Sequence, residues 1–107
     1  MKVHVIEADM TGGIGAVVQN RDALGRDIVA LAAKSGEEIH FHDFTDPVGG
    51  APVIMLECSD AFIAQVRTLP GFQKSYDVWQ DMATERKPAI AAYFSAPKPA
   101  RPNGPKP

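Results

Sequence analysis

The chain has 107 residues, which is the usual length of one domain. Its composition, with 45% hydrophobic and 22% charged residues, is that of an ordinary globular protein, and its net charge of -2 does not favour binding to nucleic acid or to anionic membranes. The single cysteine, Cys58, excludes an internal disulfide and a multi-cysteine metal site.

No apolar run in the sequence approaches the ~20 residues of a membrane span. The opening residues, from Met1 to Glu7, are too few and turn acidic too soon for a secretory signal. We therefore expect a small cytoplasmic protein with neither nucleic acid nor membrane as a partner.

The first predicted element is a strand over residues 2–7, in which Val3 and Val5 alternate with polar side chains and should face the core. A glycine-rich loop over residues 11–18 follows. A helix should then start at Asp22, a typical N-cap residue. Its predicted apolar face has i, i+4, i+7 spacing and consists of Leu24, Ile28 and Leu31, and it should end at Ser35 and Gly36.

Two strands joined by a proline- and glycine-rich turn come next, with the strands at residues 39–44 and 52–58 and the turn at 46–50. In the first of these strands Ile39 and Phe41 should face the core. Because side chains alternate along a strand, His40 and His42 should then point to the other side of the sheet.

A second helix should begin at Ser59 or Asp60, and a fourth strand is predicted over residues 75–80. The apolar stripe of this helix is Phe62, Val66 and Leu69, and Pro70 with Gly71 should end it. The order strand, helix, strand, strand, helix, strand predicts a ferredoxin-like α+β sandwich, with two helices on one face of a four-stranded antiparallel sheet.

The composition changes near Lys87, because six of the prolines fall in residues 88–107. Proline cannot donate a backbone hydrogen bond and does not continue a helix or a central strand. We therefore expect a domain over residues 1–87 and an extended, disordered proline-rich tail over residues 88–107.

The glycine-rich residues 11–18 are similar to the opening of dinucleotide-binding dehydrogenases, where backbone amides hold a pyrophosphate. However, Val18 replaces the third glycine of that pattern, and the chain is too short for the second half of a doubly wound domain. The segment is therefore interpreted as a connecting loop, and no cofactor is predicted.

The three histidines raise the possibility of a metal site, since neutral imidazole is a common metal ligand. His40 and His42 should share a face, and His4 is predicted on the same side but roughly 10 Å away, with Glu57 or Met55 between them. The favoured interpretation is three solvent-facing imidazoles. His40 and His42 remain weak candidates for metal ligands, and no metal is predicted.

Cys58 precedes a predicted helix N-terminus, a position that can lower the pKa of a thiol. No basic partner lies near it in the sequence, so a small buried hydrophobe is the favoured interpretation. Because no catalytic triad or cysteine–histidine pair can be recognised, the sequence predicts a protein that is not an enzyme.

The open side of the predicted sheet should carry apolar side chains among the histidines, namely Ile6, Val53, Met55 and Trp79. A few scattered hydrophobes on a wet face are the alternative interpretation. An apolar patch of this kind usually marks a partner, and aromatic side chains concentrate binding energy. We therefore favour a partner-binding surface with Met55 and Trp79 as its anchors.

Residues 50–72 resemble the second half of subtilisin propeptide-like protease inhibitors, in the glycine before a strand and in the corner at residues 69–72. Residues 75–81 take the place of the final strand of that family, which closes with an acidic residue. In that family the sheet packs on the protease, and the chain leaving the last strand lies in the active-site cleft. The resemblance therefore implies an inserting segment made of Asp81, Met82, Ala83 and Thr84.

The strand-helix-strand pattern is also similar to small chaperones for twin-arginine signal peptides and to dimeric regulatory sheets of the amino-acid-sensing type. The resulting prediction is a non-enzymatic module that binds a protein or peptide partner, such as a subtilisin-like protease. The alternative is a ligand- or metal-responsive regulatory homodimer that associates through the open sheet face.

Overall fold

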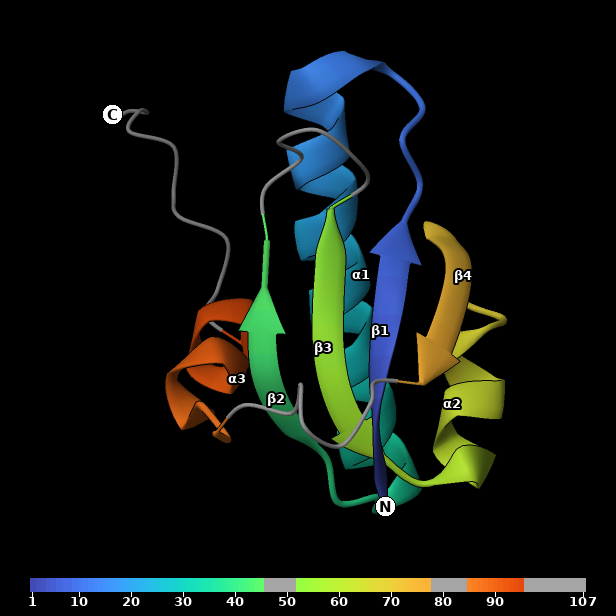
Figure 1. Ribbon diagram of the computed structural model, residues 1–107, viewed down its shortest axis with the longest axis vertical. Helices are drawn as coiled ribbons and strands as arrows, with labels where there is room; N and C mark the ends of the chain where they lie inside the picture. Colours follow the sequence, from blue (N-terminus) through green and yellow to red (C-terminus); the bar gives the residue numbers. More distant parts are fainter. Residues whose placement is uncertain (46–51, 78–84, 96–107) are drawn as a thin grey trace.

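The computed structural model describes residues 1–45, 52–77 and 85–95 and shows a four-stranded sheet with three helices (Figure 1). The elements in chain order are β1 (Lys2–Ala8), α1 (Gly13–Ser35), β2 (His40–Phe44), β3 (Val53–Cys58), α2 (Asp60–Val66), β4 (Phe72–Asp77) and α3 (Pro88–Ser95). The strand order is β2-β3-β1-β4, and each neighbouring pair is antiparallel. The predicted ferredoxin-like α+β architecture is confirmed.

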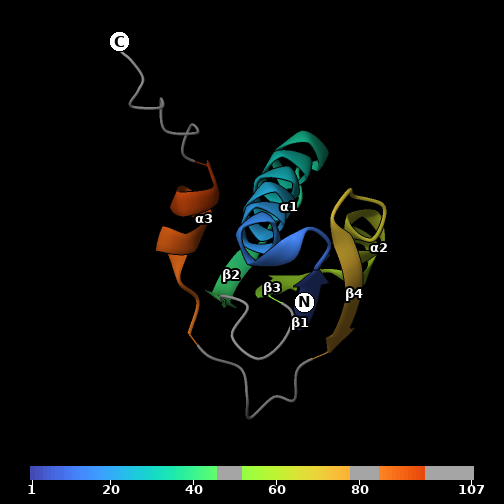
Figure 2. The ribbon, with the colours of Figure 1, turned by 90° about the horizontal axis from the view of Figure 1, so that it is seen from above.

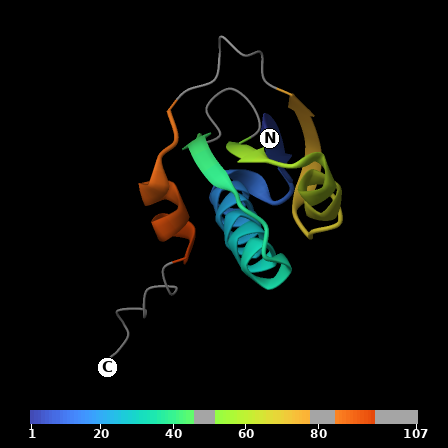
Figure 3. The same cartoon turned by 90° about the horizontal axis from the view of Figure 1, so that it is seen from below.

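The helices α1 and α2 cover the same face of the sheet, and α3 lies beside α1 at the β2 end (Figure 2 and Figure 3). The core between the sheet and the helices is almost completely buried and includes Ile6, Leu24, Ile28, Ile54, Leu56, Phe62 and Val66. Each such side chain contributes about 1.5–3 kcal/mol on burial. No helix of the described residues covers the opposite side of the sheet, which is called the helix-free face below.

The two sides of β1 are the reverse of those predicted. The side chains that point to the helices are His4, Ile6 and Ala8, all of them buried. Val3 and Val5, predicted to lie in the core, are half-buried on the helix-free face. They share that face with Glu7, whose carboxylate would be costly to bury without a partner. On the helix-free face Glu7 lies 3.8 Å from the ammonium of Lys74.

The helix α1 begins at Gly13, well before the predicted cap at Asp22, so most of the predicted glycine-rich loop is helical. Its buried stripe extends back at i, i+4 spacing through Arg21 to Val17. The predicted stripe did not include Arg21, because arginine is seldom fully buried, and it therefore stopped short of Val17. The predicted end is confirmed, since Gly36 caps the helix in the left-handed conformation with φ 71°.

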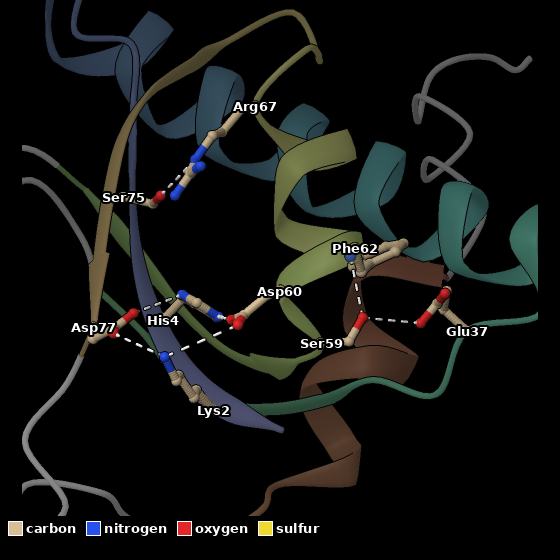
Figure 4. Close-up of polar contacts among 9 residues, drawn as sticks. All are labelled: Lys2, His4, Glu37, Ser59, Asp60, Phe62, Arg67, Ser75 and Asp77. Atoms are coloured by element: carbon tan, nitrogen blue, oxygen red, sulfur yellow. Dashed lines mark hydrogen bonds and ion pairs between the residues drawn. The ribbon is translucent and has the colours of Figure 1, made fainter.

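The helix α2 starts where predicted. Ser59 is its N-cap, and the hydroxyl accepts a 3.1 Å hydrogen bond from the backbone amide of Phe62 (Figure 4). The strand β4 begins at Phe72, three residues before the predicted start, and extends to Asp77. The rest of the predicted fourth strand, residues 78–80, lies outside the described residues.

The predicted extended tail begins with a helix instead. Pro88 opens α3 at the first helical position, where no backbone donor is needed. Ile90 and Phe94 are buried in the core, so the predicted domain boundary after residue 87 is wrong. The remainder of the predicted tail, residues 96–107, lies outside the described residues.

Two contacts hold α3 on α1. Phe94 packs so closely over Gly25 that an added Cβ would lie 2.4 Å from the aromatic ring. Beside it, the Tyr93 hydroxyl donates to Asp22 Oδ2 at 2.8 Å, and Asp22 Oδ1 accepts from Arg21 Nη2 at 2.8 Å. The missing side chain at Gly25 therefore permits the close approach of the two helices.

Replacing Gly25 with Ala should lower the free energy of unfolding by about 1–3 kcal/mol, because Phe94 must move out of its packed position. Replacing Gly15 with Ala in the same helix is the matched control, since nothing lies within 4 Å of a Cβ there. The control should be neutral or more stable by up to about 1 kcal/mol. Urea denaturation measures both values, and a Gly25→Ala variant as stable as the native chain would contradict this account of α3.

Candidate functional site

A row of three side chains crosses the helix-free face. Val5 of β1 lies opposite Met55 of β3 on one side and opposite Tyr76 of β4 on the other. Val5 and Met55 are half-buried, and Tyr76 is 49% exposed. We call Tyr76, Val5 and Met55 the central row. It lies on the helix-free face, because Val5 and Met55 alternate along their strands with the core residues Ile6, Ile54 and Leu56.

Charged side chains flank the central row on both sides along the strands. In one direction Glu7 lies opposite Lys74, with the two charged groups 3.8 Å apart. In the other direction Glu57 of β3 lies opposite His40 of β2. An apolar centre with a polar rim is the usual arrangement of a protein–protein interface.

Glu57 is the most firmly held charge of this rim. Its Oε1 lies 2.8 Å from His42 Nε2 and accepts a 2.9 Å hydrogen bond from Arg86 Nε, while Oε2 accepts from Arg86 Nη2 at 2.8 Å. Hydrogen bonds from Arg86 and then from His42 lower the pKa of Glu57 to about 2, against the effect of desolvation. Glu57 is therefore ionised near neutral pH and serves as an acceptor for its two neighbours.

The residues next to Arg86 tie the chain to the outer edge of β2. The Lys87 amide donates to the Phe41 carbonyl at 2.8 Å, and the Lys87 ammonium lies 3.9 Å from Asp43 Oδ1. Together with the Arg86–Glu57 pair, these contacts hold residues 86 and 87 against the sheet. The β2 edge is thus occupied by the chain itself, at Phe41.

The arrangement of the three histidines differs from the predicted one. His40 and His42 lie on the helix-free side, where they contact the carboxylates of Glu38 and Glu57. His4 lies on the opposite face, so its predicted orientation is wrong. The favoured picture of three solvent-facing imidazoles is wrong as well, because His4 and His42 are buried. Across residues 1–45, 52–77 and 85–95, no three His, Cys, Asp or Glu side chains form a group that could hold a metal ion.

The interpretation of Cys58 as a buried apolar side chain is confirmed. The thiol is completely buried in the core at the end of β3. Desolvation, followed by the charges of Asp60, Glu37 and Glu57, raises its pKa to about 12. A thiol that stays protonated at neutral pH is a poor nucleophile, so the structure argues against a catalytic role for Cys58.

Of the predicted partner-binding residues, Met55 lies on the helix-free face as predicted. The others, Trp79, Asp81, Met82, Ala83 and Thr84, lie outside the described residues. Ile6, predicted beside Met55, is buried in the core instead. Sequence reasoning missed Val5 and Tyr76, and the signal that could have found Val5 is the charge of Glu7 two residues away.

Comparison with known proteins gives no match to a family model, to a curated protein or to a solved structure. The similarity to subtilisin propeptide-like inhibitors therefore remains a hypothesis drawn from the sequence. None of the helices in the described parts of the chain has the length and apolar character needed to cross a membrane.

Replacing Glu57 with Gln should lower the midpoint of thermal unfolding at pH 7 by about 4–8 °C, the shift that roughly 1 kcal/mol produces in a domain of this size. The loss is smaller than for a fully buried charge pair, because Arg86 is half-exposed and water screens it. An unfolded glutamate titrates near 4.5 and the folded Glu57 near 2, so this stability is present above pH 4.5 and is lost as the pH falls toward 2.

The matched control is Glu38→Gln, which removes an exposed carboxylate beside His40. It should change the midpoint by much less than Glu57→Gln does. Calorimetry of both variants from pH 7 to pH 2.5 makes the comparison. If Glu57→Gln is as stable as the native chain and keeps the same pH profile, the Arg86–Glu57 pair does not hold residues 86 and 87 as described.

Proposed function

We propose that this protein is a non-enzymatic binding module that holds an extended segment of a protein partner against the helix-free face and strand β4. The observation that carries the proposal is the central row of Tyr76, Val5 and Met55. It is an apolar strip across three strands with charged pairs on both sides. A partner that buries this strip gains hydrophobic energy without having to desolvate an unpaired charge.

The position of β4 supports an extended partner. In the strand order β2-β3-β1-β4, the described sheet ends at β4 on one side. On the other side, the Phe41 carbonyl of β2 accepts a hydrogen bond from the Lys87 amide. Most of β4 is exposed, including Tyr76. A strand added beside β4 would pair with its backbone, and its side chains would continue the central row.

The side chains that most resemble catalytic groups, Cys58 and Glu57, favour binding over chemistry. Cys58 is buried with a raised pKa, and the pKa of Glu57 is held far below neutral by two donors. The sequence similarity to subtilisin propeptide-like inhibitors suggests a subtilisin-like protease as the partner. A peptide-binding chaperone would use the same surface, because it also captures extended chain segments.

The proposal is tested with a subtilisin-type serine protease and a chromogenic peptide substrate. The native chain should slow substrate cleavage, and Met55→Glu should weaken this inhibition at least tenfold, because it places a charge in the middle of the apolar row. The matched control, Ala30→Glu, adds the same charge on an exposed position of α1, away from the sheet, and should inhibit like the native chain.

A native chain with no effect on the protease would remove the inhibitor form of the proposal. Affinity capture from the source organism then tests the binding module itself, and the expected partner is retained by the native chain and by Ala30→Glu but lost by Met55→Glu. If no captured protein shows this discrimination, the helix-free face is not a binding surface. Light scattering tests the alternative function, a homodimer that associates through this face. A native chain that is dimeric and a Met55→Glu variant that is monomeric would mean that the face binds a second copy.

A further inference from the structure

A buried histidine lies where β1, β4 and α2 meet. The side chain of His4 is 3% exposed, with Asp77 of β4 on one side and Asp60 of α2 on the other (Figure 4). Asp77 Oδ1 is 3.2 Å from His4 Nδ1, and Asp60 Oδ1 is 4.0 Å from Nε2. Neither ring nitrogen has a hydrogen-bond partner among the described residues.

The same two carboxylates also face a permanent positive charge. The ammonium of Lys2 lies 3.6 Å from Asp77 Oδ2 and 4.0 Å from Asp60 Oδ2. We call Lys2, His4, Asp60 and Asp77 the His4 cluster. Since the carboxylates face opposite nitrogens of the imidazole and already pair with Lys2, the cluster is not arranged to hold a metal ion on one ring nitrogen.

The charge of His4 depends on two opposing effects. Desolvation lowers the pKa of His4, and the charges of Asp77 and Asp60 offset this only in part. Arg67, which follows α2, and Lys2 lower it further. His4 is thus neutral in the folded protein at pH 7, whereas in an opened chain it would titrate near 6.5.

We propose that His4 is a proton-responsive residue that, when neutral, lets β4 and α2 pack against β1 and, when protonated under mildly acidic conditions, loosens this junction. The two carboxylates leave a buried imidazolium without hydrogen bonds at its ring nitrogens, and water can reach and hydrate it only when β4 and the start of α2 separate from β1. The proton thereby selects between a closed and an opened junction. The inference does not depend on whether the helix-free face binds a partner.

The difference in the pKa of His4 between the closed and the opened junction fixes how pH changes the stability of the closed state. A group whose pKa is lower in the closed state than in the opened state stabilises the closed state above pH 6.5 and loses this effect as the pH falls. At pH 5.5 opening should therefore be favoured by up to about tenfold relative to neutral pH. This factor is the expected increase in hydrogen-exchange rate for β4 amides that pair with β1, after correction for the intrinsic pH dependence of exchange.

Two NMR measurements on the native chain test the proposal. The His4 ring signals should titrate below pH 6.5, and β4 amides should exchange severalfold faster at pH 5.5 than at pH 7. The acid-induced gain should vanish in His4→Gln, with His4→Leu as a second variant if Gln impairs folding. The matched control His40→Gln replaces a partly exposed histidine on β2 and should keep the gain.

Asp77→Asn and Asp60→Asn add a direct check on the cluster. Removing either carboxylate should move the titration of His4 to lower pH, because each raises the pKa of His4 in the native chain. The proposal is overturned if His4 titrates at or above pH 6.5. It is also overturned if β4 exchange in the native chain shows the same pH dependence as in the His4 variants.

Discussion

The central strands β1 and β3 pair so that Ile6 lies opposite Ile54 and Val5 lies opposite Met55. This register divides the side chains of the sheet into one set that faces α1 and α2 and another that faces away. Because side chains alternate along a strand, a shift of one residue would exchange the two sets completely. The central row, the Glu57 pair with Arg86 and the burial of His4 all depend on this one pairing.

The two edges of the sheet differ in the contacts that the rest of the chain makes with them. At β2 the Lys87 amide bonds to the Phe41 carbonyl, and α3 packs Phe94 over Gly25 of α1. At β4 the described sheet ends with exposed side chains, and His4 lies between Asp77 and Asp60 where that strand and α2 meet β1, the junction that we propose responds to protonation. An edge held by its own chain and an edge that responds to protonation would suit the binding module that we propose, because the domain would keep its shape while the β4 side opens.

Much of the fold could be predicted because local signals agree with the final structure. The Ser59 cap, the left-handed Gly36 and the alternating Ile54 and Leu56 each report on neighbours close in sequence. The start of α1 could not be predicted in the same way, because the buried Arg21 is stabilised by contacts with Thr45 and Phe44 that exist only in the folded chain.

The prediction for β1 assigned its two faces the wrong way round, and this error affected the predicted site. Both faces of this strand carry apolar residues, so alternation alone does not choose between them. The charge of Glu7 decides, because its carboxylate finds Lys74 on the helix-free face. The helix α3 could not be predicted for a related reason, since the local sequence opens with Pro88 and the helix is stabilised by tertiary contacts: Ile90 and Phe94 in the core and the Tyr93 hydrogen bond to Asp22.

The most direct measurement is the effect of a soluble paramagnetic probe on methyl signals in NMR spectra. If Val5 and Met55 lie on the helix-free face, we expect strong broadening of their methyl signals and little change for Ile6 and Leu56. The opposite order, with Val5 and Met55 protected and Ile6 broadened, would show that the two faces of the sheet are exchanged and would contradict the proposed site.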